Sequence, residues 1–259
     1  SYYFYKNLKL GHQRLKVIDL SSKANQPMFS KDKRYCCVYN GEIYNYRHLK
    51  NILESKNYNF KTNSDTEVLL NSFHYWKYDC VKHLEGMYAF AIYDLKKNEV
   101  FLSRDRFGIK PIYYFKGKNR IAFASEMKAF MFLNDKSRPS FDDNILINLR
   151  IHESIEKTFL KNVFSLPPGC SIKIKDKKLS FKKWWNLKNN LIEIDKENIY
   201  EEFYEIFNDS LKKTLVSDVK VAFTLSGGLD SSSLALASNN IIKDDNQKIY
   251  TSRDANFLI

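Results

Sequence analysis

Residues 226–232 read SGGLDSS and follow VAFTL, an apolar run with the composition of a buried strand. The adjacent glycines Gly227 and Gly228 allow a tight turn, and LDSSSLALAS after them has the composition of a helix start. A helix that begins after such a turn offers free N–H groups to phosphate oxygens. The lysine of the Walker A loop, GxxxxGK[ST], is missing, which argues against a kinase or a GTPase. The structural alternative is an ordinary glycine turn before a helix capped by Asp230.

This loop resembles the pyrophosphate loop of the ATP pyrophosphatases, which split ATP between its α and β phosphates. The preceding SDVKVAFTL resembles the version found in glutamine-dependent asparagine synthetases. The resemblance implies ATP and Mg²⁺ as cofactors, with Asp230 as the metal ligand, because hard carboxylate oxygens suit this ion. The residues it implies for binding ATP or pyrophosphate are Leu225, Ser226, Gly227, Gly228, Asp230, Ser231 and Ser232.

The first two thirds of the chain resemble the class II glutamine amidotransferase domain of the same family, which hydrolyses glutamine to supply ammonia. LGHQRLKVIDL, YNGEIYN and NSDTEV resemble three of its segments, and LEGMYAFAIYD, SRDRFGIKPIYY, FASEMKA and LPPG follow in the family order. The residues that the resemblance implies for glutamine binding are Arg14, Leu15, Val17, Ile18, Asn40, Gly41, Glu42 and Asp65.

The physical chemistry of five of these residues suits the roles that the resemblance implies. A zwitterionic amino acid needs a cation and an anion, and Arg14 offers a planar fork for the α-carboxylate while Asp65 meets the α-amino group. The amide of Asn40 and the N–H of Gly41 form the oxyanion hole, and Glu42 faces the ammonia end. The structural alternatives are a surface ion pair for Arg14, a type I′ hairpin turn at Asn40-Gly41 and a helix start at Asp65.

The family's nucleophile has no counterpart in this sequence. The resemblance implies an amino-terminal cysteine whose own α-amino group is the base, followed by an RGPD-like segment, and neither is present. Ser1 lies too close to the LGHQRL segment, and Cys36 and Cys37 have no free α-amine beside them. We therefore assign no catalytic residue here and expect the nucleophilic cysteine upstream of Ser1. The sequence has the character of a fragment, also at its end, where SRDANFLI departs from the family pattern.

Two further departures lie inside the matched segments. Tyr39 stands where the family usually has a small or apolar residue, and Lys220 stands where it often has proline. We expect neither residue to touch the proposed chemistry.

The elements that must hold these residues are strands first and helices later. Short aromatic or β-branched runs predict strands in SYYFY, LGHQRLKVIDL, RYCCVYNGEI, GMYAFAIYD, EVFLSRD, PIYYF and RIAFAS. Helical spacing predicts helices in NYRHLKNILESK and SDTEVLLNSFHYWK, the second with Ser64 as N-cap and Glu67 completing a capping box. A hairpin is predicted within residues 163–185, and a long helix over residues 197–216.

The domain organisation follows from a change of pattern near Lys220, where a strand, a glycine turn and a helix begin a parallel α/β unit. The polar residues 187–196 are the predicted linker. We expect residues 1–186 to form an α+β domain that lacks its start. The resemblance implies that this domain is the αββα sandwich of the amino-terminal-nucleophile hydrolases. Residues 197–259 are then the first part of an ATP pyrophosphatase domain of the asparagine synthetase type.

The composition limits the classes of partner and the cellular compartment that we expect for this protein. The net charge of +12, from 42 Lys+Arg against 30 Asp+Glu, is scattered along the chain, so we expect no nucleic-acid partner. The four cysteines lack a CxxC or Cys/His spacing, which indicates reduced core residues. No run of 18 or more apolar residues and no charged-then-apolar leader is present, so we expect no membrane partner and a cytoplasmic location. A homodimer stays open.

The resemblance implies a glutamine-hydrolysing asparagine synthase, whose small-molecule partners are glutamine, aspartate and ATP. Ammonia from glutamine amidates an aspartyl-adenylate made in the second domain. Two alternatives stay open. One is an enzyme of the same family that amidates another carboxylate, such as a sugar acid in cell-surface polysaccharide synthesis. The other is a regulatory or binding module that kept the fold and lost the nucleophile.

Overall fold

The computed structural model describes residues 1–6, 8–118, 120–133, 139–142, 156–191, 197–244 and 250–251. The chain divides into two compact units. The first consists of Ser1–Arg14 and Ser21–Asn190, and the second of Leu15–Leu20 and Leu191–Ile259. Part of the predicted linker forms a short 3₁₀ helix, η4 (Leu187–Asn190), and residues 192–196 lie outside the described residues.

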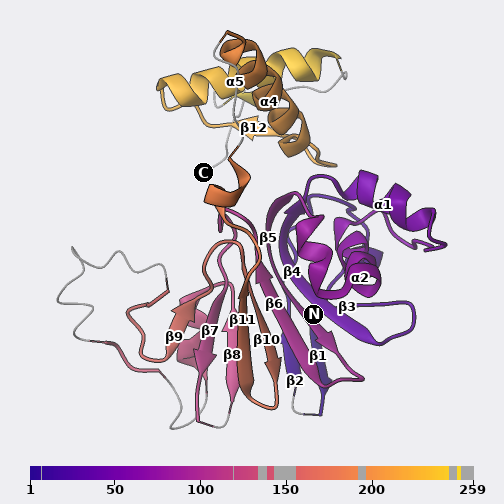
Figure 1. Cartoon of the computed structure of the whole chain (residues 1–259), viewed down its shortest axis with the longest axis vertical. Coiled ribbons are helices and arrows are strands. Elements are labelled where there is room, and N and C mark those ends of the chain that lie inside the picture. Colours follow the sequence, from indigo (N-terminus) through magenta and orange to yellow (C-terminus); the bar gives the residue numbers. More distant parts are fainter. Residues whose placement is uncertain are drawn as a thin grey trace. The chain divides into compact units, whose positions relative to one another are not determined.

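The centre of the first unit is a six-stranded antiparallel sheet with the order β11-β10-β6-β5-β4-β3 (Figure 1). Its strands are β3 (Met28–Phe29), β4 (Tyr35–Ile43), β5 (Gly86–Asp94), β6 (Glu99–Arg104), β10 (Cys170–Lys175) and β11 (Lys178–Lys183). β4 and β5 pair over their whole lengths, from Tyr35 opposite Asp94 to Ile43 opposite Gly86. The predicted strands RYCCVYNGEI, GMYAFAIYD and EVFLSRD and the predicted hairpin of β10 and β11 are confirmed.

Two helices cover one face of this sheet: α1 (Tyr46–Glu54) and α2 (Asp65–Trp76). A 3₁₀ helix, η2 (Lys77–Lys82), follows α2. The ring of Phe73 on α2 packs against Tyr35 and Phe101 of the sheet, with centroid distances of 5.2 and 5.6 Å. Burial of these aromatic rings holds the helices to the sheet.

The predicted N-cap of α2 is confirmed, because the Ser64 hydroxyl accepts a hydrogen bond from the Thr66 N–H at 3.1 Å. The predicted capping box is wrong. The Glu67 carboxylate accepts hydrogen bonds from the N–H groups of Lys61 and Thr62, the latter at 2.7 Å, while the Ser64 N–H donates to the Thr62 hydroxyl. The Glu67 side chain therefore binds the loop that precedes the helix, and it does not bind the N–H of the N-cap residue Ser64.

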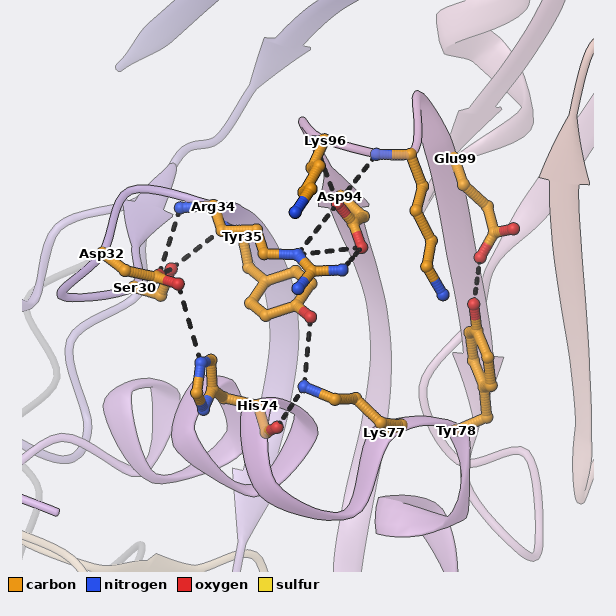
Figure 2. A network of polar contacts seen from close by, with 11 residues as sticks. Ser30, Asp32, Arg34, Tyr35, His74, Lys77, Tyr78, Asp94, Lys96 and Glu99 are labelled. Atoms are coloured by element: carbon orange, nitrogen blue, oxygen red, sulfur yellow. Dashed lines mark hydrogen bonds and ion pairs between the residues drawn. The ribbon is translucent and has the colours of Figure 1, made fainter. Parts of the chain in front are cut away.

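A polar network joins the turns at one end of this sheet to α2, as Figure 2 shows. The Arg34 guanidinium donates to the Asp94 carboxylate at 2.8 Å, and the N–H groups of Lys96 and Lys97 donate to the other oxygen of Asp94. On α2, the His74 imidazole lies 3.6 Å from the Asp32 carboxylate. The network closes the turn that leads from β5 into β6.

The second face of the sheet packs against two smaller antiparallel sheets. One pairs β1 (Tyr2–Tyr5) with β2 (Leu8–Gly11), and the other has the order β8-β7-β9. The bounds of the latter three strands are Ile121–Ala124 for β8, Tyr113–Lys116 for β7 and Val163–Ser165 for β9. The core between the layers contains Leu10, Cys36, Val38, Ala89, Ala91, Leu102, Ile112, Tyr114, Leu166, Ile172 and Ile174.

The outer face of the β8-β7-β9 sheet is covered by a 3₁₀ helix, η3 (Met127–Phe132). Phe130 of this helix packs in one buried cluster with Phe115, Leu160 and Val163. Helices, sheet, sheet and helical turn therefore follow one another, which confirms the predicted α+β sandwich; residues 143–155 lie outside the described part. The predicted strand over residues 10–20 is wrong beyond Gly11, where β2 ends.

The second unit contains α4 (Ile199–Thr214), β12 (Ala222–Phe223), α5 (Leu229–Asp244) and β13 (Tyr250–Thr251). β12 and β13 pair in parallel, with α5 as the connection between them, as predicted for the start of a parallel α/β unit. Its core consists of Leu211 and Leu215 with Phe207, Val221, Phe223, Ala237 and Ile241.

The segment Leu15–Leu20 belongs to this second unit although both of its neighbours along the chain belong to the first. The Asp218 N–H donates to the Val17 carbonyl at 3.0 Å, and the Asp19 N–H donates to the Asp218 carboxylate at 2.7 Å. Across the whole part of the chain that the structure describes, no helix combines the length and the apolar character needed to cross a membrane.

Candidate functional site

Asn40 and Gly41 lie inside β4, opposite Ala89 and Tyr88 of β5, so the hairpin turn considered for them is excluded. Tyr88 directs its hydrogen bonds to the other side, since its N–H donates to the Asp105 carboxylate and its carbonyl accepts from the Asp105 N–H. In an antiparallel pair of this kind, the N–H of Gly41 points away from β5. The Gly41 N–H therefore points toward the side of β4 on which β3 lies. β3 pairs only with Cys36 and Cys37, so it does not extend as far as Gly41.

Asp65 is the first residue of α2 and is only 4% exposed. One oxygen of its carboxylate accepts hydrogen bonds from the Tyr39 hydroxyl at 2.7 Å and from the Ile43 N–H at 3.1 Å. Burial raises the pKa of this carboxyl, whereas those two donors, the Thr66 N–H and the charge of Arg14 lower it, and the pKa stays above its ordinary value. Asp65 does begin a helix, yet its carboxylate is held by β4.

Arg14 follows β2, and its guanidinium donates to the Ser21 carbonyl at 3.1 Å. The positive charge of the same guanidinium lowers the pKa of Asp65, so a cation and an anion of the first unit interact electrostatically. This is the pair of charges that an α-amino acid zwitterion requires.

The other three residues predicted beside glutamine, Leu15, Val17 and Ile18, belong to the second unit. Leu15 is 87% exposed, and Ile18 is 4% exposed. Their contact with glutamine stays a prediction.

Glu42 is a half-buried carboxyl on β4, two residues after Asn40. Burial raises the pKa of Glu42 and the nearby charge of Asp65 raises it further, while Lys110 lowers it. A carboxyl in this environment can accept a hydrogen bond from an amide or from ammonia, or hold a proton itself.

Tyr39 is a residue of this site that the sequence pattern missed. Its N–H donates to the Gln26 side-chain oxygen at 2.6 Å, its carbonyl accepts from His12 Nε2 at 2.9 Å, and its hydroxyl donates to Asp65. The expectation that Tyr39 does not touch the proposed chemistry is wrong, because its hydroxyl donates a hydrogen bond to Asp65, one of the residues predicted to bind glutamine. His12 lies two residues before Arg14 in the same motif, which is the one signal the sequence gives for it.

A cavity of about 90 Å³ opens between the sheets beside Asn40. His12 and Tyr39 line it from the Asn40 side, and Phe123 and Ser125 line it from β8 and the residue that follows. The candidate oxyanion residue Asn40 therefore lines a small cavity between the two layers.

The cysteines of this unit do not have the environment of a nucleophile. All four are free thiols, and Cys36, Cys37 and Cys80 are buried. Burial raises the pKa of Cys36 to about 12 and that of Cys37 well above its ordinary value. A thiol with a raised pKa is protonated and unreactive at neutral pH. Cys36 and Cys37 therefore remain poor candidates for the nucleophile.

The SGGLDSS loop connects β12 to α5 in the second unit. Gly227 has a φ of +83°, and a Cβ atom placed on it would meet no atom within 4 Å. The Ser226 and Ser231 hydroxyls lie 3.1 Å apart, and the Gly228 N–H donates to the Ser226 hydroxyl at 3.4 Å. Asp230 is exposed in the first turn of α5. The loop is thus an open turn at a helix amino terminus, which suits phosphate oxygens.

Within the described ranges, no group of three or more His, Cys, Asp or Glu side chains could enclose a metal ion. Mg²⁺ needs no such enclosure, since it commonly binds through one or two carboxylates, water and substrate phosphates. The exposed carboxylate of Asp230 beside the SGGLDSS loop fits that mode of binding.

Residues 1–185 match the glutamine amidotransferase domain family, and residues 202–246 match the asparagine synthase family. The chain belongs to the glutamine amidotransferase domain family. It is 35% identical over 261 aligned residues to asparagine synthetase (glutamine-hydrolyzing) 3 of Bacillus subtilis, covering 93% of this chain and 40% of that protein. It is 36% identical over 253 aligned residues to putative asparagine synthetase (glutamine-hydrolyzing) 2 of Methanocaldococcus jannaschii, covering 90% and 48%. The chain therefore spans less than half the length of these relatives.

Proposed function

We propose that this chain is the amidotransferase part and the first stretch of the synthetase part of a glutamine-hydrolysing asparagine synthase. Residues 1–186 are the proposed amidotransferase domain, residues 187–196 the linker and residues 197–259 the beginning of the synthetase domain. The observation that carries the proposal is the placement of the buried Asp65 carboxylate within the field of Arg14 and against β4, which also bears Asn40 and Gly41.

In the proposed glutaminase step, Arg14 holds the α-carboxylate of glutamine and Asp65 holds its α-ammonium group. The side-chain amide then lies along β4, where the Asn40 amide and the Gly41 N–H donate to the oxygen that becomes negative under nucleophilic attack. Glu42, on the same strand, accepts a hydrogen bond from the nitrogen that leaves as ammonia. The nucleophile itself is expected from residues that precede Ser1.

In the proposed synthetase step, the open loop from Ser226 to Ser232 holds the pyrophosphate end of ATP while an aspartate carboxylate is adenylated. The N–H groups at the start of α5 bind phosphate oxygens, and Asp230 supplies a carboxylate for Mg²⁺. Bound Mg²⁺ supplies positive charge that stabilises the pyrophosphate leaving group. The match of residues 202–246 to the asparagine synthase family supports these assignments.

The test is the fate of the glutamine amide nitrogen in the intact protein. The enzyme is given glutamine labelled with ¹⁵N in the amide, together with aspartate, ATP and Mg²⁺, and ¹⁵N-asparagine, AMP and pyrophosphate are measured. Labelled asparagine in step with pyrophosphate is the expected result. Hydrolysis of glutamine without asparagine would favour another carboxylate acceptor, and the absence of any hydrolysis would favour a binding module.

A further inference from the structure

We propose that Tyr39 positions the glutamine site: its hydroxyl orients the Asp65 carboxylate, and its main chain, held by Gln26 and His12, sets the position of Asn40. This inference rests on the proposed glutaminase function. It adds to the site three residues, Tyr39, Gln26 and His12, that contact the predicted glutamine ligands or their neighbours instead of the substrate.

The hydroxyl contact joins two buried side chains of different elements. Tyr39 and Asp65 are each 4% exposed, and 2.7 Å separates the phenolic oxygen from Asp65 Oδ2. The Ile43 N–H donates to that same oxygen, and Oδ1 lies 3.4 Å from the Ser64 hydroxyl. The carboxylate is therefore fixed from β4 on one side and from its own helix start on the other.

The main-chain contacts follow from the alternation of β4. Every second residue of this strand directs its N–H and carbonyl away from β5, and along that row Cys37 pairs with Met28 of β3. Tyr39 is the next residue of the row, beyond the end of β3, and Gln26 and His12 take the place of a strand partner. Gly41, the third in the row, has its N–H directed toward the proposed oxyanion.

His12 has a defined tautomer in this arrangement. The Tyr39 carbonyl can only accept a hydrogen bond, so the ring nitrogen Nε2 carries the proton and donates it at 2.9 Å. Burial is the largest influence on the pKa of His12 and lowers it, which favours the neutral ring at neutral pH. The imidazole thus supplies one fixed donor to the carbonyl whose peptide bond leads to Asn40.

The charged and titratable groups that face Asp65 decide what loss of the hydroxyl would do. Tyr39, Cys37 and Glu42 lie on β4, and Arg14 lies after β2. Burial raises the pKa of Asp65, whereas the Tyr39 hydroxyl is the largest influence that lowers it. Removal of this hydroxyl therefore raises the pKa of Asp65 further, and the ionised form that binds the α-ammonium group is lost at a higher pH.

The first test is Tyr39→Phe in the intact protein, with ammonia release from glutamine measured from pH 5 to 9. The acid limb of kcat/KM reports groups of the free enzyme, so it should move up by about one pH unit, and the KM for glutamine at neutral pH should rise about tenfold. Asparagine formation from free ammonia should be unchanged. An acid limb and a KM equal to those of the wild type would overturn the role of the hydroxyl.

The matched control is Tyr35→Phe, which removes a buried hydroxyl from the same strand and the same face. Tyr35 is 1% exposed, and its hydroxyl accepts a hydrogen bond from Lys77 Nζ at 3.2 Å, away from Asp65. This variant should keep the acid limb of the wild type even where its melting temperature falls. Equal shifts of the acid limb in both variants would mean that general loosening of the sheet is responsible, and would overturn the inference.

The main-chain arm is tested by two substitutions of His12. His12→Leu removes the donor, and misplacement of Asn40 should lower kcat for ammonia release by up to about a hundredfold without moving the acid limb. His12→Gln carries an amide N–H near the position of Nε2 and should restore most of the activity. Equal loss in both variants would overturn this arm. A wild-type protein that releases no ammonia from glutamine would overturn the proposed function itself, a result distinct from either outcome.

Discussion

A Cβ atom on Gly41 would lie 2.1 Å from the carbonyl oxygen of Met87 on the neighbouring strand and 2.7 Å from the Cα atom of Tyr88. The φ of Gly41 is +149°, a value that L side chains rarely adopt. Both atoms in its way belong to the backbone of β5, so no side-chain rotation can relieve the contact. The backbones of β4 and β5 therefore fit together here only around a glycine.

The first prediction is that Gly41→Ala both destabilises the first unit and abolishes glutamine hydrolysis. Backbone shifts of this kind typically cost about 1–3 kcal/mol of unfolding free energy, and they displace the N–H proposed for the oxyanion. Urea unfolding and ammonia release from glutamine measure the two effects. Gly11→Ala is the control, because its Cβ would meet the flexible Tyr2 ring at 3.2 Å. A Gly41→Ala protein as active as the control would show that the oxyanion is held elsewhere.

The second prediction concerns Arg14, which donates to the Ser21 carbonyl and acts electrostatically on Asp65. Arg14→Ala should lower kcat/KM for glutamine by about 1.5–3 kcal/mol in transition-state stabilisation, as expected for a hydrogen-bonded charge. Arg14→Lys should recover part of the loss, since lysine keeps the charge without the planar fork. Asparagine formation from free ammonia is the internal control. If it falls as much as formation from glutamine, Arg14 supports the structure and not the substrate.

The third prediction uses the ion pair of Arg34 and Asp94 in Figure 2. Burial raises the pKa of Asp94, but the hydrogen bonds from Arg34, Lys96 and Lys97 outweigh it and leave the pKa below its ordinary value. A carboxyl with a depressed folded-state pKa stabilises the fold above its unfolded-state pKa, and this stabilisation is lost as the pH falls through the folded value. Asp94→Asn should therefore destabilise the protein at pH 7 by about 1.5–3 kcal/mol, and progressively less as the pH falls below the ordinary pKa of an aspartate.

Asp79→Asn is the matched control for this measurement. Asp79 pairs with Lys82 at 2.8 Å, three residues on, but both side chains are more than half exposed, at 55% and 56%. An exposed pair of this kind contributes about 0–1 kcal/mol, so urea unfolding at pH 7 should separate the two variants. Equal free energies of unfolding would mean that the Asp94 network adds nothing beyond an exposed ion pair.

The sequence was sufficient for those features that depend on neighbours along the chain. Ser64 caps α2 because its hydroxyl accepts a hydrogen bond from the N–H two residues on, and the local sequence SDTEV is enough to predict this cap. The continuous apolar and aromatic runs of β4 and β5 predicted strands because both strands are buried on their two faces. The parallel pairing of β12 and β13 around α5 was equally readable from a strand, a glycine turn and a helix.

Contacts between segments that are far apart in the chain could not be predicted from the sequence. Tyr39 and Asp65 are 26 residues apart, and only the fold shows that the hydroxyl of one binds the carboxylate of the other. Glu67 has the spacing of a capping box, yet the loop before α2 offers it the N–H groups of Lys61 and Thr62. The strand predicted over residues 10–20 ends at Gly11 because β1 pairs with only its first part. In each case a tertiary partner outweighed a local preference.

The last prediction concerns Asp230, which is exposed at the start of α5 beside the loop from Ser226 to Ser232. In the intact protein, Asp230→Asn should abolish pyrophosphate release and leave ammonia release from glutamine intact, because an amide cannot supply the charge that holds Mg²⁺. Asp209→Asn on α4 is the control; this residue pairs with Lys213 at 2.8 Å, is 65% exposed and has no proposed role in catalysis. If Asp230 only caps the helix, its substitution would cost about 1 kcal/mol of stability and spare pyrophosphate release, as in the control. Because the two half-reactions are measured on one sample, near-normal pyrophosphate release would remove the nucleotide assignment of SGGLDSS and leave the glutamine site unaffected.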